Sequence, residues 1–328
     1  MNNIFTELTP ALQIMKKTIL FILLILFLFS CKSEKEEIKT PQKELDQSTD
    51  TNLVKEQFRY QPVKPENGKL KAVVELGASG FNSFIINVDE DKNWEIKNKE
   101  YGNSSILESH TNTKEVSSKL KSYIKKIIDF GVDSKDIHFV VSSGADKKNI
   151  TQTIKKELKD LGYNVNVVTA EEEGQFALKA VMPKSFEDTA FVVDIGSGNT
   201  KISYVEGSSI ISKETYGAKY FQNNLDDKKV YKEVNAIAGN IPEQKQKQYF
   251  IIGGVPYQLA KKLRKDKERY TLLNTSIEAY QDVIEKKGAK VKSGVNIFNA
   301  INDATKPRII VFDWDSNFTI GFLLSLKH

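Results

Sequence analysis

Two segments of the sequence repeat one pattern, and this duplication constrains the fold more than any other feature. Residues 73–80 read Val-Val-Glu-Leu-Gly-Ala-Ser-Gly, and residues 192–199 read Val-Val-Asp-Ile-Gly-Ser-Gly-Asn. Each apolar run ends at an acidic residue and passes through a glycine-rich turn into a second apolar run, at 84–88 and 202–205. A short apolar run bounded by turn residues predicts a buried strand. The repetition therefore predicts a chain built from two similar halves.

The two turns also predict an anion-binding site. A glycine-rich turn leaves backbone N–H groups accessible, and successive N–H groups in such a turn form a concavity that binds anions. The carboxylate at each strand end can hold a metal ion or a water. Two such turns that face each other across a cleft would hold a phosphate chain from both sides. The alternative is a pair of hairpins that need glycine only for their backbone angles.

The rest of the sequence predicts two units of the order βββαβα. We expect the remaining strands at 94–96, 137–141, 165–168, 190–195, 201–205, 209–212, 249–252, 308–312 and 319–323. Apolar residues at helical spacing predict helices at 116–128 and 150–161, and we also expect helices at 171–181, 218–225 and 257–263. A chain of 328 residues exceeds the usual size of one domain, so we expect domains at 70–189 and 190–328 with a cleft between them.

The N-terminal region has the features of a secretion signal. Met15-Lys16-Lys17 precedes an apolar run that is too short to span a bilayer and suits a signal peptide at 1–30. Residues 28–31, Leu-Phe-Ser-Cys, resemble a bacterial lipobox, although Phe29 is larger than usual. We therefore expect lipid attachment at Cys31, the only cysteine, and a cell-envelope location, on the outer membrane rather than the inner. The alternative is a plain signal anchor, or an apolar helix with a stray cysteine.

Composition separates the N-terminal tail from the folded part. Residues 31–69 are rich in Lys, Glu, Gln, Ser, Thr and Asp with few large apolar residues, which predicts a flexible linker. Beyond it, the net charge of +5 is modest, and lysine and glutamate are interspersed. A nucleic-acid-binding protein usually concentrates its basic residues in one stripe. We therefore expect no nucleic-acid partner.

From Lys71 to the C-terminus, the order of the motifs resembles the exopolyphosphatase and guanosine pentaphosphate phosphohydrolase (Ppx/GppA) family of the actin-like superfamily. Residues 75–81 resemble its first phosphate loop, and residues 194–200 resemble its second. Residues 216–218, Tyr-Gly-Ala, resemble a later Gly-Ala turn, and residues 251–254 resemble a Gly-Gly segment that Val255 follows instead of threonine. The resemblance implies an α/β fold of two actin-like domains, each a ribonuclease H-like βββαβα unit.

The resemblance also implies the site and its chemistry. Residues 169–173, Thr-Ala-Glu-Glu-Glu, resemble a segment whose second glutamate is the proposed catalytic base, which corresponds to Glu173. Glu75 and Asp194 would hold Mg²⁺ or another divalent cation through water. The residues expected to bind phosphate are Gly77, Ala78, Ser79, Gly80, Gly196, Ser197, Gly198, Asn199 and Lys201. The implied reaction removes the terminal phosphate of polyphosphate or of a phosphorylated nucleotide. The alternative for Glu173 is a carboxylate that only complements the helix dipole.

Three departures from the family pattern leave a second hypothesis open. Glu75 replaces the usual aspartate, and Lys201 replaces a glutamate, which reverses the charge. Where the family places an arginine on phosphate, this chain offers Lys147 or Lys148, which lack the bidentate guanidinium. The second hypothesis is therefore a catalytically degenerate member that binds polyanions or a partner protein. An ATP-driven actin-like protein or kinase is disfavoured because ATP is not maintained beyond the inner membrane. Homodimer formation is left open.

Overall fold

The computed structural model describes residues 58–77, 80–103 and 113–326, all within one compact unit, Thr51–His328. The predicted signal peptide, the lipid site Cys31 and residues 31–57 of the predicted linker lie outside the described residues, as do Ala78 and Ser79 of the first turn. Within the described ranges, no helix combines the length and the apolar character needed to cross a membrane.

The first half of the chain forms a five-stranded sheet with the strand order β3-β2-β1-β4-β5. Strands β1, β2 and β3 are antiparallel neighbours, whereas β4 runs parallel to β1 and β5 parallel to β4. The elements are β1 Lys69–Leu76, β2 Phe81–Val88, β3 Trp94–Asn103, α3 Thr113–Asp129, β4 Ile137–Val141, α4 Asn149–Asp160, β5 Val165–Val167 and α5 Ala170–Val181.

The second half repeats this topology in a six-stranded sheet with the order β10-β11-β9-β6-β7-β8. Strand β6 occupies the place of β1, with antiparallel β7 on one side and parallel β9 on the other. The elements are β6 Ala190–Ile195, β7 Asn199–Glu206, β8 Ser209–Tyr216, α6 Asp227–Gly239, β9 Gln248–Gly253, α7 Gly254–Leu263, β10 Tyr270–Leu272, α8 Gln281–Lys287, α9 Ala289–Thr305, β11 Ile309–Asp313 and α10 Phe318–Ser325. The duplicated α/β fold expected from the sequence is confirmed.

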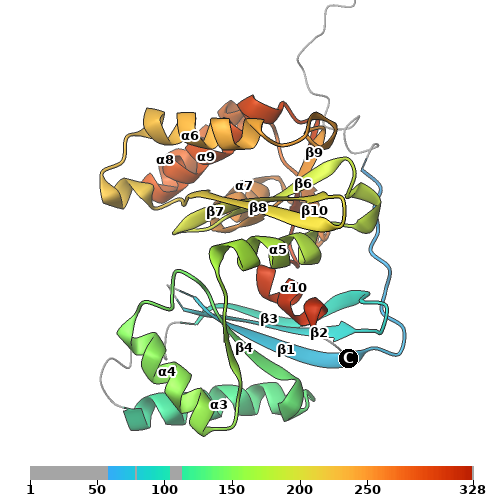
Figure 1. Ribbon diagram of the computed structural model, residues 1–328, viewed down its shortest axis with the longest axis vertical. Coiled ribbons are helices and arrows are strands. Elements are labelled where there is room, and N and C mark those ends of the chain that lie inside the picture. The colour runs from blue at the N-terminus through green and yellow to red at the C-terminus, as the bar shows by residue number, and fades with distance from the viewer. Residues whose placement is uncertain (1–57, 78–79, 104–112, 327–328) are drawn as a thin grey trace, which may run out of the picture. The chain divides into compact units, whose positions relative to one another are not determined.

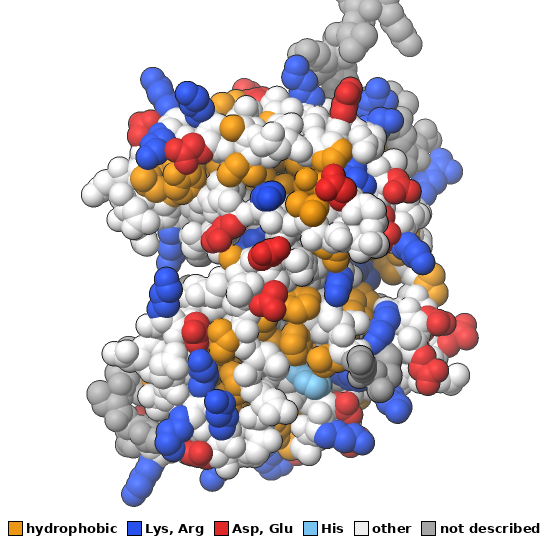
Figure 2. Space-filling view, viewed as in Figure 1, with side chains coloured by type: hydrophobic (Ala, Val, Ile, Leu, Met, Phe, Trp, Pro, Cys, Tyr) orange, Lys and Arg blue, Asp and Glu red, His pale blue; other side chains and the backbone are white. Residues whose placement is uncertain are grey.

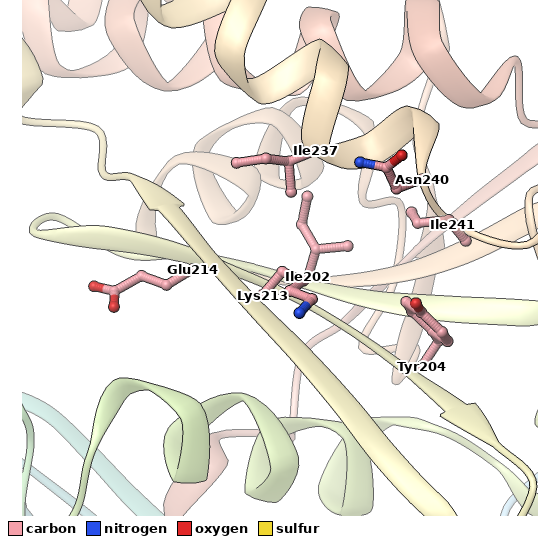
Figure 3. Close-up of a pocket in the computed structure, with 7 residues that line it drawn as sticks. All are labelled: Ile202, Tyr204, Lys213, Glu214, Ile237, Asn240 and Ile241. Atoms are coloured by element: carbon pink, nitrogen blue, oxygen red, sulfur yellow. The ribbon is translucent and has the colours of Figure 1, made fainter.

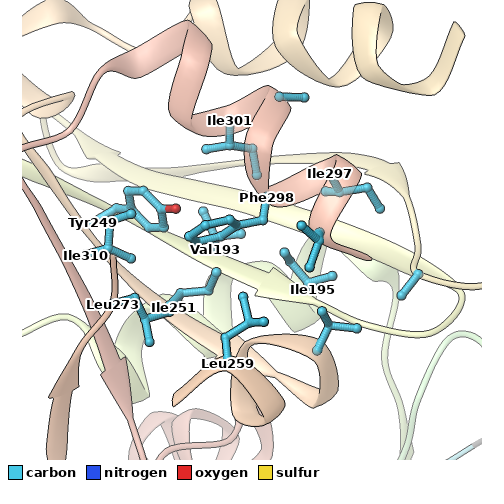
Figure 4. Close-up of a cluster of buried hydrophobic side chains, with 14 of the residues drawn as sticks. Val193, Ile195, Tyr249, Ile251, Leu259, Leu273, Ile297, Phe298, Ile301 and Ile310 are labelled. Atoms are coloured by element: carbon cyan, nitrogen blue, oxygen red, sulfur yellow. The ribbon is translucent and has the colours of Figure 1, made fainter. Parts of the chain in front are cut away.

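Three apolar cores lie between the layers of helices and sheets that Figure 1 shows. Helices α3 and α4 cover the outer face of the first sheet, where Phe139 and Leu120 are buried. Helices α6 to α9 cover the outer face of the second sheet, and Phe298 of α9 packs there against Val193 of β6 (Figure 4). Helices α5 and α10 lie between the two sheets in a third core. This middle layer joins the halves.

Helices α5 and α10 cross with unusually little space between them. A Cβ atom added to Gly321 of α10 would lie 1.8 Å from the carbonyl oxygen of Phe176 in α5. On its other side α5 packs against β7 and β8, where a Cβ at Gly174 would lie 2.0 Å from the Ser212 hydroxyl. Helix α5 therefore follows the first sheet in sequence but rests on the second, and two glycines allow its close approach.

The prediction of a strand at 319–323 is wrong, because these residues lie in α10. The helix begins after Asn317, whose side-chain oxygen accepts a hydrogen bond from the Thr319 N–H at 2.8 Å. Helix α10 is apolar on nearly every side because it is buried between two sheets. Such a helix shows no periodicity, so a short apolar run cannot be distinguished from a buried strand.

The helix expected at 218–225 is only a short 3-10 turn, Tyr220–Asn223. Asn224 adopts a left-handed conformation with φ of 53°, which ends the turn. Helix α6 then begins after Asp226, whose carboxylate accepts hydrogen bonds from the Lys228 and Lys229 N–H groups, both at 3.0 Å. The sequence patterns did not predict α6, α8, α9 or β10.

The predicted linker does not extend through residues 58–60. The Phe58 ring stacks on Phe186 at 5.8 Å and meets the edges of Phe250 and Tyr270 at 5.9 and 5.5 Å. Tyr60 lies against the same Phe186 and Tyr270 rings. Residues 31–69 are polar on average, so their composition did not indicate that these two aromatic residues pack against the folded part.

Candidate functional site

The two glycine-rich turns have the same construction. In the first, the Gly77 N–H donates to the Gly80 carbonyl at 3.0 Å, and in the second the Gly196 N–H donates to the Asn199 carbonyl at 3.0 Å. These hydrogen bonds close the turns, so they use two of the amides that we expected to bind phosphate. Phosphate binding at Gly77 and Gly196 stays a prediction, and their N–H groups are hydrogen-bonded within the turns in this structure. The equivalence of the turns is confirmed.

The segment after β8 braces the second turn. The Ala218 and Lys219 N–H groups donate to the carbonyls of Gly196 and Ser197 at 2.9 and 3.0 Å. A Cβ at Gly217 would lie 2.3 Å from the Asn199 nitrogen, so only glycine allows this contact. Gly198, in contrast, is exposed and faces open space. The segment after β8 therefore supports the second turn on one side, whereas Gly198 on the other side is open to solvent.

Four charged side chains converge beside the turns, three of them from strands β1, β6 and β7 and one from helix α5. Glu75 is the penultimate residue of β1 and Asp194 that of β6, and Lys201 of β7 lies directly opposite Asp194 in the sheet register. Glu173, in the first turn of α5, pairs its Oε2 atom with the Lys201 ammonium. The exposed fractions of Glu75, Glu173, Asp194 and Lys201 are 8, 2, 9 and 5%. The structure thus brings the three predicted acids and Lys201 into one buried cluster.

The N-terminus of α5 explains why Glu173 points into this cluster. Thr169 and Glu172 form a capping box: the Glu172 N–H donates to the Thr169 hydroxyl at 3.2 Å, and the Thr169 N–H donates to the Glu172 carboxylate at 2.8 Å. Glu171 and Glu172 are exposed, whereas Glu173 is buried. The three consecutive glutamates therefore differ in role, and Glu173 does more than complement the helix dipole.

Sequence reasoning missed three polar groups that hold the carboxylates. The Ser143 N–H donates to Glu173 Oε1 at 2.6 Å, and this turn after β4 is where we expected a phosphate-binding lysine. The Asn82 side-chain amide donates to Glu75 Oε2 at 2.8 Å, and the Asn317 amide lies 3.4 Å from the same oxygen. The β1–β2 hairpin pattern could have indicated Asn82, which pairs with Glu75 in register. No local signal indicates Asn317.

Burial and mutual repulsion shift the protonation of this cluster. Burial raises the pKa of Glu75 from 4.5 to about 7, against the Asn82 hydrogen bond, and the charges of Glu173 and Asp194 raise it further. Burial likewise raises the pKa of Asp194, although Lys201 opposes the shift. For Lys201, burial would lower the pKa, but the charges of Asp194 and Glu173 outweigh it and the net shift is upward. Lys201 therefore stays charged while Glu75 titrates near neutrality.

Replacement of Glu75 by glutamine is expected to change how stability depends on pH. Because the pKa of Glu75 is higher in the folded state, the wild type loses stability as pH rises from 4.5 through 7. At pH 8 the glutamine variant should be more stable than wild type by about 3 kcal/mol, since one pKa unit corresponds to about 1.4 kcal/mol. Urea unfolding at pH 4.5 and pH 8 measures this. An equal difference at both pH values would contradict the assignment.

The residues of the cluster do not fit a divalent cation. The resemblance implied that Glu75 and Asp194 hold one, yet the Lys201 ammonium already lies among the carboxylates, in contact with Glu173. Glu75 and Glu173 each direct an oxygen to an N–H donor. In the part of the chain that the structure describes, no group of three or more His, Cys, Asp or Glu side chains is arranged to hold a metal ion. The expected Mg²⁺ has no suitable set of ligands here.

One cavity in the second half of the chain lies apart from the charged cluster. A cavity of about 130 Å³ lies between β7, β8 and the end of α6, where Ile202, Tyr204 and Ile241 contribute apolar side chains (Figure 3). It opens on the face of β7 opposite to Lys201, because side chains alternate along a strand. On the face drawn in Figure 2, basic and acidic side chains are interspersed.

The duplicated sheets, the paired turns and the acidic cluster define an α/β protein of the actin-like ATPase fold. Residues 76–293 match the Ppx/GppA phosphatase family, so the chain belongs to that family. The solved Ppx/GppA family member from Aquifex aeolicus is 18% identical and superposes with a TM-score of 0.60, over 78% of this chain and 97% of that one. An exopolyphosphatase from Cytophaga hutchinsonii is 14% identical, with a TM-score of 0.56 over 79% and 99%. A search of curated proteins found no match.

Proposed function

We propose that this protein is a phosphohydrolase of the exopolyphosphatase type. Its substrate is the terminal phosphoanhydride of polyphosphate or of a phosphorylated nucleotide. The observation that carries the proposal is the convergence of Glu75 and Asp194, at equivalent positions of β1 and β6, with Glu173 of α5, beside the glycine-rich turns. Family membership and the fold of the solved exopolyphosphatase support it.

In the proposed reaction, a water attacks the terminal phosphorus and the bridging P–O bond breaks. The products are orthophosphate and a chain shorter by one phosphate. Glu173 accepts the proton of the attacking water; Ser143 and Lys201 hold its carboxylate, which retains lone pairs to accept that proton. The Lys201 ammonium and the N–H groups of the turns offset the negative charge that develops on the transferred group.

Phosphate release from inorganic polyphosphate by the purified full-length chain tests this proposal. Wild type should release phosphate, and Glu173→Gln should lower the rate by about 100-fold or more, because a general base contributes that much. The matched control is Glu172→Gln, which changes the neighbouring exposed glutamate of the same helix and should keep most of the activity. Absence of release by wild type from polyphosphate and from a guanosine pentaphosphate, or equal losses in both variants, would refute the proposal.

A specific observation favours the second hypothesis, a catalytically degenerate protein that binds polyanions. Lys201 neutralises the carboxylate that would serve as base, in a pair from which water is nearly excluded. Calorimetric titration with polyphosphate distinguishes the two hypotheses. Saturable binding without phosphate release would support the binding protein, and release with loss in Glu173→Gln would exclude it.

We also propose that the protein is displayed on the cell envelope through a lipid at Cys31. The lipobox-like segment and the preceding apolar run support this location. Metabolic labelling with a palmitate analogue in a bacterial host should mark the wild type and leave Cys31→Ser unmarked. Equal labelling of both would contradict the anchor.

A further inference from the structure

We infer that the Lys201 ammonium takes the place of the divalent cation, so that this site carries its own positive charge and does not bind a metal ion. The inference rests on the proposed function only in assuming that the cluster is the phosphate-handling centre. It goes beyond that function, because it states that the centre works without Mg²⁺ or Mn²⁺.

The register of the second sheet fixes the position of Lys201. Side chains of paired antiparallel strands lie close together on one face of the sheet, and the register of β6 and β7 sets Lys201 directly opposite Asp194. The aliphatic part of Lys201 is buried with its head group, since only 5% of the residue is exposed. The ammonium is therefore held among the carboxylates and does not reach out to solvent.

Helix α5 closes the cluster from the other side. Gly174 allows α5 to pack closely on the second sheet, since a Cβ added to Gly174 would lie 2.8 Å from the Ser203 hydroxyl of β7. This contact brings the neighbouring Glu173 onto Lys201, which lies two residues before Ser203 along β7. Mg²⁺ requires nearly octahedral oxygen ligands and retains several waters. Lys201 is already paired with Glu173 and lies opposite Asp194 in the register, so the carboxylates that such an ion would need already face an ammonium.

The charge of the cluster also favours a resident ammonium. Glu173 and Asp194, together with Glu75, which titrates near neutrality, surround one ammonium, and Lys201 balances their negative charge without a bound ion. Lys245 offers a contrast within the same half of the chain. It is as buried as Lys201, at 6% exposure, but it donates to the Glu187 carbonyl at 2.6 Å. Burial alone therefore does not distinguish Lys201 from Lys245. The position of Lys201 among acidic side chains does.

Mn²⁺ binding, followed by the electron paramagnetic resonance signal of the free ion, tests the inference on the full-length chain without substrate. Wild type should show no saturable binding at millimolar Mn²⁺. Lys201→Gln should gain one site, at least about tenfold tighter than any wild-type binding. The double variant Lys201→Gln/Asp194→Asn should lose that site again. Lys245→Gln is the matched control and should behave as wild type.

Two results would overturn the inference. One is saturable Mn²⁺ binding by wild type that Asp194→Asn abolishes. The other is a Lys201→Gln variant that is folded by circular dichroism but gains no site. If that variant does not fold, the Mn²⁺ titration of the wild type alone tests the inference. Because phosphate release is not measured, a protein that lacks hydrolase activity can still pass this test, and an active one can fail it.

Discussion

Replacement of Gly321 by alanine is expected to lower the free energy of unfolding by about 3 kcal/mol or more, the upper range for overpacking a core. The added methyl would lie 1.8 Å from the Phe176 carbonyl oxygen, a backbone atom that cannot rotate away. Helices α5 and α10 would have to move apart, and this movement would disrupt the apolar packing between the two sheets. Alanine is otherwise the better helix former by about 1 kcal/mol, so the steric term must exceed this gain.

Urea unfolding followed by circular dichroism measures the effect. The matched control is Gly239→Ala in α6, where an added Cβ meets nothing within 4 Å. There we expect no loss, or a gain of up to about 1 kcal/mol. If both variants unfold at the same urea concentration as wild type, this result would contradict the close crossing of α5 and α10.

Replacement of Lys201 by methionine is expected to cost about 3–5 kcal/mol, the usual effect of removing one partner from a buried ion pair. Methionine keeps much of the side-chain volume, so the loss reports on charge. Glu173 would remain 2% exposed with only the Ser143 N–H to stabilise it, next to two further acids. The exposed pair of Lys125 and Asp129 gives the comparison, since Lys125→Met should cost no more than about 1 kcal/mol.

A second substitution separates charge from packing. In the double variant Lys201→Met/Glu173→Gln, the unpaired carboxylate is gone, and we expect at least about half of the lost stability to return. Unfolding free energies of the wild type, both single variants and the double variant complete the cycle. Additive losses in the double variant would show that the two side chains do not interact.

Much of the fold follows from local sequence patterns. Residues 73–76 and 192–195 indicated the two central strands, and helical spacing indicated α3 and α4. The pattern failed where burial removed periodicity, as in α10, and where a few aromatic residues interrupted a polar stretch, as at Phe58. Both failures have one cause. The environment on all sides of a segment is set by distant parts of the chain.

The candidate site divides in the same way. Sequence alone determined the repeated acid-and-turn pattern, the three acids and the charge reversal at Lys201, because residue identity and spacing along the chain are local properties. Only the tertiary structure decided that Lys201 binds Glu173, that Ser143, Asn82 and Asn317 hold the carboxylates, and that Gly77 and Gly196 use their N–H groups within the turns. These contacts join elements far apart in sequence, and they form because α5 and α10 fit closely between two sheets.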